Sequence, residues 1–167
     1  MFRFGLDRVL VVFFCITILY GLLFSLPEGL GVPVSHDSPW PPLRSLHAWA
    51  VEQEPAHLEP PAVLIASCLF DGLFQAPILG FVSYGLLRRR RWVRPLGLFY
   101  SGAAITNMFF YFATTFLGPT PPPNLGVYLP FNLPWLIAPA VLGLRLLPKD
   151  PFSESLLSPA GRRPAAS

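Results

Sequence analysis

The sequence predicts an all-α fold, a bundle of four membrane-spanning helices, and three observations lead to it. Of the 167 residues, 53% are hydrophobic and only 13% are charged, whereas soluble domains carry about 25% charged residues. Apolar runs long enough to cross a bilayer recur along the chain, and the basic residues that flank them fall on one side of the predicted membrane. The runs cover residues 9–26, 61–87, 96–117 and 128–147.

The first run, residues 9–26, carries no charge and ends at Pro27-Glu28-Gly29. A secretory signal peptide is the alternative interpretation, with an apolar region of about 7–15 residues and a cleavage site of small residues. This run is longer and no Ala-x-Ala pattern follows it. We therefore expect a retained first span.

The polar connection that follows the first span contains apolar residues at helical spacing, which predicts a short interfacial helix in the first lumenal loop. Two tryptophans, Trp40 and Trp49, are expected at the depth of the lipid headgroups. The residues at helical spacing are Leu43, Leu46, Trp49 and Ala50.

Four consecutive basic residues, Arg88, Arg89, Arg90 and Arg91, separate the second and third runs. A nucleic-acid patch is one interpretation, but the position between two closely spaced spans indicates a topology anchor that contacts anionic headgroups. No nucleic-acid partner is expected. Both termini then lie in the cytoplasm: residues 1–8 as a short N-terminus, 9–152 as the membrane domain and 153–167 as a disordered tail.

Asp71 is the one acidic residue deep inside an apolar run. An ionisable group there costs about 2.5–3.5 kcal/mol on insertion scales and marks a candidate functional site. Ser67, Asp71 and Gln75 are spaced i, i+4 and i+8, so they share one face of a helix. Pro77 removes a helical hydrogen bond next to this face, which predicts a kink.

The third and fourth runs carry further polar residues that can face Asp71. They are Asn107 and Tyr111 in the third run and Asn132 and Trp135, three residues apart, in the fourth. A carboxylate pairs with a cation or a hydroxyl group, and tryptophan offers its π face to positive charge. This set predicts an intramembrane pocket for a lipid-like amphiphile, although Asn107 is equally well explained as a hydrogen-bonded link between helices.

Glu28 lies just beyond the first span, either reaching the same pocket from its rim or solvated at the helix end. Cys15 and Cys68 both lie in apolar runs, so we expect buried thiols rather than a disulfide. The chain has no paired Cys/His spacing, so neither a metal nor another cofactor is expected.

The residues of the second and third runs resemble the EXPERA-domain superfamily, which includes the emopamil-binding sterol isomerase and the sigma-2 receptor. The resemblance extends from about Val9 to Phe152 and is closest to the sigma-2 receptor branch. The stretches that carry it are Leu69-Phe70-Asp71, Phe74-Gln75-Ala76-Pro77, Trp92-Val93-Arg94-Pro95 and Asn132-x-x-Trp135.

This resemblance implies a four-span bundle of the endoplasmic reticulum or a related endomembrane, if the source is eukaryotic. It also implies a pocket for sterols or cationic amphiphiles and a homodimer as an assembly to test. Sterol isomerases of the superfamily have a histidine four residues before the acid, where this chain has Ser67, and a second acid in the third span, where Asn107 is the nearest polar residue.

Three functions follow from these observations. The first is non-enzymatic binding of a sterol or another lipid-like or cationic amphiphile, anchored by Asp71. The alternative is a sterol double-bond isomerase that transfers protons with Asp71 and Glu28, since such a shuttle needs both a donor and an acceptor. The third is a structural or trafficking role in which side chains fill the pocket.

Overall fold

The computed structural model describes the fold of residues 2–152, and it confirms the all-α prediction, because this part of the chain contains no strand. Four helical segments in the described chain are long and apolar enough to cross a membrane. The tail expected at 153–167 lies outside the described residues. The four segments cover Gly5–Gly29, Ala62–Leu87, Val93–Leu117 and Leu125–Leu146.

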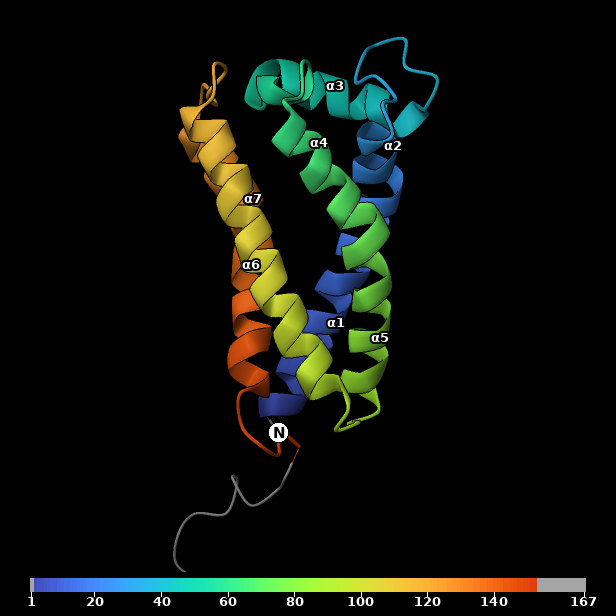
Figure 1. Ribbon diagram of the computed structural model, residues 1–167, viewed down its shortest axis with the longest axis vertical. Coiled ribbons are helices and arrows are strands. Elements are labelled where there is room, and N and C mark those ends of the chain that lie inside the picture. The colour runs from blue at the N-terminus through green and yellow to red at the C-terminus, as the bar shows by residue number, and fades with distance from the viewer. Residues whose placement is uncertain (1, 153–167) are drawn as a thin grey trace, which may run out of the picture.

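Each of the first two segments is a helix interrupted by one turn of π-helix, whereas the third and fourth are single α-helices (Figure 1). The first consists of α1 (Phe2–Tyr20), η1 (Gly21–Ser25) and α2 (Leu26–Gly29), and the second of α4 (Ala62–Leu69), η3 (Phe70–Gln75) and α5 (Ala76–Leu87). The last two are α6 (Val93–Leu117) and α7 (Leu125–Leu146).

A proline lies just after each of the two π turns. Pro27 and Pro77 are the second residues of α2 and α5, the helices that follow η1 and η3. A proline has no N–H, so the carbonyl four residues earlier loses its usual helical partner. For Pro27 that carbonyl belongs to Leu23, and it accepts a hydrogen bond from Trp40 Nε1 at 2.6 Å.

The short helix expected in the first connection is α3 (Pro41–Gln53), which lies across one end of the bundle (Figure 1). We call this end the α3 end. Leu43, Leu46 and Ala50 on its apolar face are buried against protein, with Val34 in the same cluster and Phe24 packed on it. The spacing therefore marks contact with the rest of the chain rather than a face that dips into lipid.

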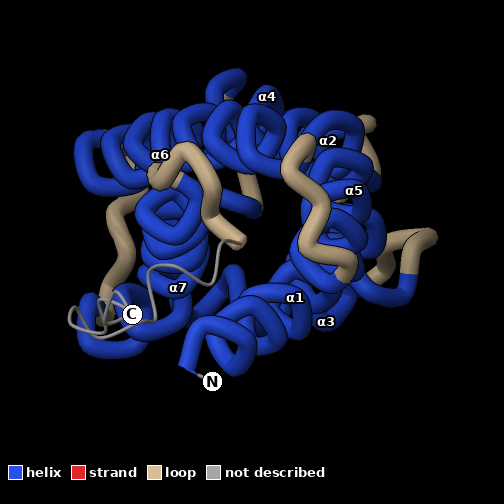
Figure 2. The backbone as a smooth tube through the Cα atoms, turned by 90° about the horizontal axis from the view of Figure 1, so that it is seen from below, coloured by secondary structure: helices blue, strands red, loops and turns tan. Residues whose placement is uncertain are grey.

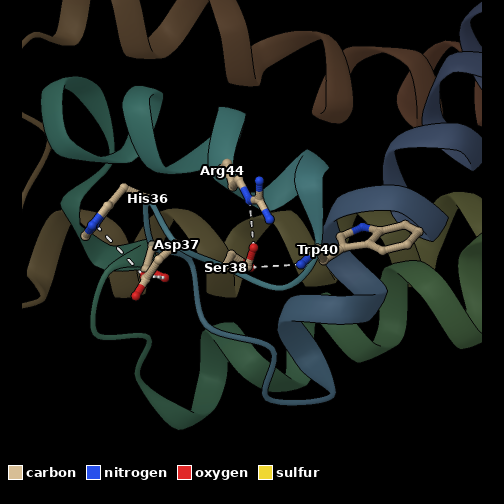
Figure 3. A network of polar contacts seen from close by, with 6 residues as sticks. His36, Asp37, Ser38, Trp40 and Arg44 are labelled. Atoms are coloured by element: carbon tan, nitrogen blue, oxygen red, sulfur yellow. Dashed lines mark hydrogen bonds and ion pairs between the residues drawn. The ribbon is translucent and has the colours of Figure 1, made fainter.

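The loop that precedes α3 is held by its own polar contacts (Figure 3). Arg44 Nε donates to the Ser38 carbonyl at 2.7 Å, and Ser35 Oγ donates to Asp37 Oδ1 at 2.8 Å. After α3, the 3₁₀ turn η2 (Pro55–His57) leads the chain down into the second span. The Arg44 bond ties the first turn of α3 to the loop that precedes it.

The apolar core fills the half of the bundle nearer the N-terminus, which Figure 2 shows from that end. Phe14, Leu79, Leu142 and Leu146 are fully buried there. The outer faces instead carry exposed large apolar residues, as expected for contact with lipid. Cys15 lies on such a face of α1 and is exposed, so the prediction that it is buried was wrong, while Cys68 is buried.

A buried ion pair joins the first and last spans at this end. Arg145 Nε and Nη2 donate to the two carboxylate oxygens of Asp7 at 2.9 and 3.0 Å. Arg94 donates to the carbonyls of Leu147 and Pro148 just after α7. Arg94 and Arg145, two of the basic residues that flank the spans, thus hold helix ends together.

Candidate functional site

A cavity of about 60 Å³ lies between the spans in the half of the bundle nearer α3. All four spans contribute to its lining, and η2 adds His57. Six of the seven predicted site residues line it: Asp71, Gln75, Asn107, Tyr111, Asn132 and Trp135. The other lining residues are Phe13, Thr17, Tyr20, Gly21, Ser25, His57, Leu64, Ser67, Cys68, Tyr100, Met108 and Phe131.

Asp71 is half-buried and faces this cavity, where two amide groups bind its carboxylate. Gln75 Nε2 donates to Asp71 Oδ1 at 3.3 Å, and Asn107 Nδ2 donates to the same oxygen at 3.2 Å. Ser67 Oγ in turn donates to Asn107 Oδ1 at 3.0 Å. The i, i+4, i+8 face of the second span thus meets the third span through Asn107, which both links helices and lines the cavity.

Two glycines allow the π turns of the first and second spans to approach each other. A Cβ atom on Gly21 would lie 3.1 Å from the Asp71 carbonyl oxygen, and one on Gly72 would lie 2.5 Å from Leu26 Cβ. Larger side chains at these positions would push η1 and η3 apart. Since π turns occur frequently at functional sites, their meeting beside Asp71 marks this level of the bundle as the site.

Glu54 forms a second polar centre that sequence reasoning missed. Its side chain, only 2% exposed, accepts hydrogen bonds from Trp49 Nε1 at 2.6 Å, from Asn132 Nδ2 at 2.9 Å and from the Tyr111 hydroxyl. In the sequence, Glu54 lies in the polar connection after the first span, where an acid is expected to be solvated. A signal was present, because Glu54 lies four residues after Ala50 and continues the buried face of α3.

His57 and Glu28 form a buried pair beside the cavity, with His57 Nδ1 2.7 Å from Glu28 Oε1 and both side chains at most 6% exposed. Burial lowers the pKa of His57, but the hydrogen bond and charge of Glu28 and the charge of Glu54 outweigh it, so the pKa is raised above its ordinary value. Glu28 itself is not among the cavity-lining residues, and the pair presents His57 instead.

Aromatic side chains close the cavity on the side of the fourth span. The Trp135 ring packs against Phe13 and Tyr20, with centroids 5.0 and 5.5 Å apart. Phe131 packs against Trp49 of α3 at 4.6 Å. An aromatic wall with carboxylate, amide and imidazole groups beside it suits an amphiphile that is mostly apolar. Within the described residues, no group of three or more His, Cys, Asp or Glu side chains could hold a metal ion.

The sequence profile of EXPERA, the EXPanded EBP superfamily, matches residues 51–146, which is more than half of the chain. The chain belongs to the EXPERA family. No match was found among curated proteins. The region matched in this EXPERA protein runs from the end of α3 to the end of α7 and so contains every cavity residue outside the first span.

Together, the family and the four apolar helices make this EXPERA protein a multi-pass membrane protein. Asp71 and His57 line the apolar and aromatic cavity, while the buried acids Glu54 and Glu28 hydrogen-bond to residues of its lining. The site offers a carboxylate at Asp71 for a cation or hydroxyl group. His57 offers a titratable group across the same cavity that can give or take a proton.

Proposed function

We propose that this EXPERA protein binds a sterol or another lipid-like or cationic amphiphile in the cavity, with Asp71 as the anchor of its polar group. The observation that carries the proposal is the position of Asp71, half-buried within a membrane span and aimed into the cavity. An asparagine would link the helices as well without the cost of an ionisable group. A carboxylate there is explained by a ligand that interacts with it.

The cavity volume sets a condition on this proposal. Pockets for small molecules usually measure about 300–1,000 Å³, so the 60 Å³ present here holds only water-sized groups. Binding therefore requires lining side chains to move apart. Gln75 and Met108 are suited to this, since both are flexible, half-buried and part of the lining.

The test is saturation binding of a radiolabelled cationic sterol-like amphiphile to the purified protein in lipid nanodiscs. Asp71→Asn keeps an oxygen that can accept from Gln75 and Asn107, so the fold is retained. Loss of the buried charge pair between Asp71 and the cationic group of the ligand lowers the binding free energy by about 2–5 kcal/mol, so affinity falls roughly 30-fold or more. Asp37→Asn, at an exposed acid of the loop before α3, is the matched control. Unchanged affinity in Asp71→Asn would contradict the role of Asp71 as ligand anchor and favour a structural function for the protein.

A second candidate is sterol double-bond isomerisation. Ser67 and Asn107 stand where the isomerases have their histidine and second acid, but the fold brings His57, paired with Glu28, to the cavity that Asp71 also lines. A donor and an acceptor on one cavity are what proton transfer needs. Conversion of a Δ8 to a Δ7 sterol by the purified protein, lost in His57→Gln and in Asp71→Asn, would establish this function over simple binding.

The remaining proposals concern the setting of the protein. We place it closest to the sigma-2 receptor branch, in the endoplasmic reticulum or a related endomembrane if eukaryotic, with both termini in the cytoplasm. The excess of arginine at the end of the bundle opposite α3 supports this orientation. Arg88 and Arg90 are exposed there and suited to anionic headgroups, while Arg91 also pairs with Asp150. A homodimer is part of the same proposal.

A further inference from the structure

One ring nitrogen of His57 is not used by the fold. The His57 side chain is only 5% exposed and lines the cavity. Its Nδ1 lies 2.7 Å from Glu28 Oε1, whereas its Nε2 makes no hydrogen bond with the described residues. Polar atoms of buried side chains nearly always have a partner, so an exception calls for an explanation. Glu28 does not line the cavity, so the ring reaches the cavity with the edge that carries Nε2.

The pair with Glu28 makes this free nitrogen a hydrogen-bond donor. A carboxylate can only accept, so Nδ1 donates its proton to Glu28. Burial lowers the pKa of His57, but the hydrogen bond and charge of Glu28 and the charge of Glu54 raise it above its ordinary value. The charged ring carries a proton on both nitrogens. Its Nε2–H group is then a buried donor that has no acceptor among the described residues.

The local fold holds this donor in one position. The His57 N–H donates to the Glu54 carbonyl at 3.1 Å, and Pro55 begins the 3₁₀ turn η2 that carries the ring. Glu28 fixes the ring from α2, at the end of the first span. Because the backbone and Nδ1 are both held, Nε2 is preorganised. A preorganised donor loses little conformational entropy when a ligand binds to it.

His57 and Asp71 bound the cavity at different levels and with opposite hydrogen-bonding character. Asp71 belongs to η3 within the second span, whereas His57 belongs to η2, before that span begins. The Asp71 carboxylate accepts hydrogen bonds, as it does from Gln75 and Asn107, while the charged His57 ring donates. A ligand with a single polar group can therefore satisfy only one of the two residues.

We propose that His57 is a second anchor of the cavity and that the ligand carries two polar groups, one toward each end of its apolar body. A cation or hydroxyl group binds Asp71, and an uncharged acceptor such as a carbonyl oxygen binds His57 Nε2. A hydrocarbon end at His57 would displace the water that can satisfy Nε2 and replace none of its hydrogen bonds. An anionic acceptor is disfavoured, because the carboxylates of Glu28 and Glu54 act on the same ring. This inference rests on the proposed function, since it adds a specificity-determining residue to the same site.

The experiment measures the affinities of two steroidal amines that share one skeleton, with either a ketone or a methylene group at the end opposite the amine. Both compete with the radiolabelled amphiphile on the whole protein in nanodiscs. At pH 6 the ketone is expected to bind about tenfold more tightly, as a hydrogen bond to a charged donor allows. At pH 9, where His57 loses its proton, this ratio falls toward one.

Both probes carry the same amine, so the titration of the amine and of the other groups around the cavity affects the two affinities alike. Those groups are Glu28, Glu54, Tyr20, Cys68, Asp71 and Tyr111. The ratio of the two affinities therefore reports on the group that meets the ketone.

His57→Asn separates ligand contact from structural support. Its amide nitrogen lies near the position of Nδ1 and can still donate to Glu28, whereas Nε2 is removed. The variant is expected to lose the preference for the ketone and to keep its affinity for the methylene probe, while loss of a merely structural residue would weaken both probes equally. His36→Asn is the matched control, because His36 is a histidine of the loop before α3 with an 84% exposed side chain, and it keeps the preference.

Two results would overturn the proposal. Equal affinities of the wild type for both probes at pH 6 would show that water alone satisfies Nε2, and this comparison decides the matter even if His57→Asn does not fold. An unchanged preference in His57→Asn would assign the ketone to another group. Asp71→Asn is expected to weaken both probes and to keep their ratio, so failure of the Asp71 anchor is distinguishable from failure of the His57 anchor.

Discussion

Replacement of Glu54 by alanine is expected to destabilise the protein strongly, although Glu54 lies in a connection between spans. Its buried carboxylate is the acceptor for Trp49 Nε1 and the Tyr111 hydroxyl, while Asn132 keeps a second bond to the Tyr128 carbonyl. Each buried donor left without an acceptor costs about 1–3 kcal/mol. Two such donors lower the free energy of unfolding by about 2–6 kcal/mol.

Thermal unfolding of the purified protein in detergent, followed by tryptophan fluorescence, measures this effect. A loss of 1 kcal/mol lowers the Tm of a chain of this size by about 2–4 °C, so Glu54→Ala lowers it by at least about 4 °C. Glu52→Ala is the control, because Glu52 is an exposed acid of the same helix, and it shifts the Tm by about 2 °C or less. Equal Tm values for the two variants would refute the inference that Glu54 ties α3 to the third and fourth spans.

Two further predictions concern the other buried charges. The pKa of His57 is raised in the fold, so the stability it contributes is complete below a pH of about 6.5 and is lost as the pH rises through the raised pKa. The Tm difference between wild type and His57→Gln is therefore larger at pH 6 than at pH 9. A pH-independent difference would contradict the charged pair of His57 and Glu28. Arg145→Met leaves the buried Asp7 carboxylate unpaired and lowers the free energy of unfolding by about 3–5 kcal/mol. Arg91→Met, at an exposed pair, lowers it by at most about 1 kcal/mol. Similar unfolding temperatures for the two variants would show that the Asp7–Arg145 pair adds nothing to stability.

The spans could be predicted from sequence because their signal is local. Hydropathy over about 20 residues identifies each span, and the spacing of Ser67, Asp71 and Gln75 identifies the polar face. The π turns could not be predicted, since they depend on how Pro27 and Pro77 combine with close packing between η1 and η3. The sequence indicated only a kink.

The burial of the polar residues in the first connection could not be predicted from the sequence. Glu54 and His57 lie in a segment rich in proline and acids. This composition is typical of solvated loops, yet both side chains are buried. Their partners are distant in sequence: Glu54 contacts Asn132, 78 positions away, and His57 contacts Glu28, 29 positions away. Local pattern carries no information on such pairings. The one indication in the sequence is that Glu54 lies four residues after Ala50, on the same face as the buried residues of α3.

The most direct test of the binding site is the position at which a bound ligand is crosslinked. A cationic sterol-like amphiphile with a diazirine group, photolysed on the protein in nanodiscs, is predicted to modify cavity residues from different spans, such as Cys68, Met108 and Trp135. An excess of unlabelled ligand abolishes this labelling, and Asp71→Asn reduces it. Labelling confined to Phe109, which is 66% exposed on the outer surface next to Met108, and unaffected by Asp71→Asn would contradict a ligand site in the cavity.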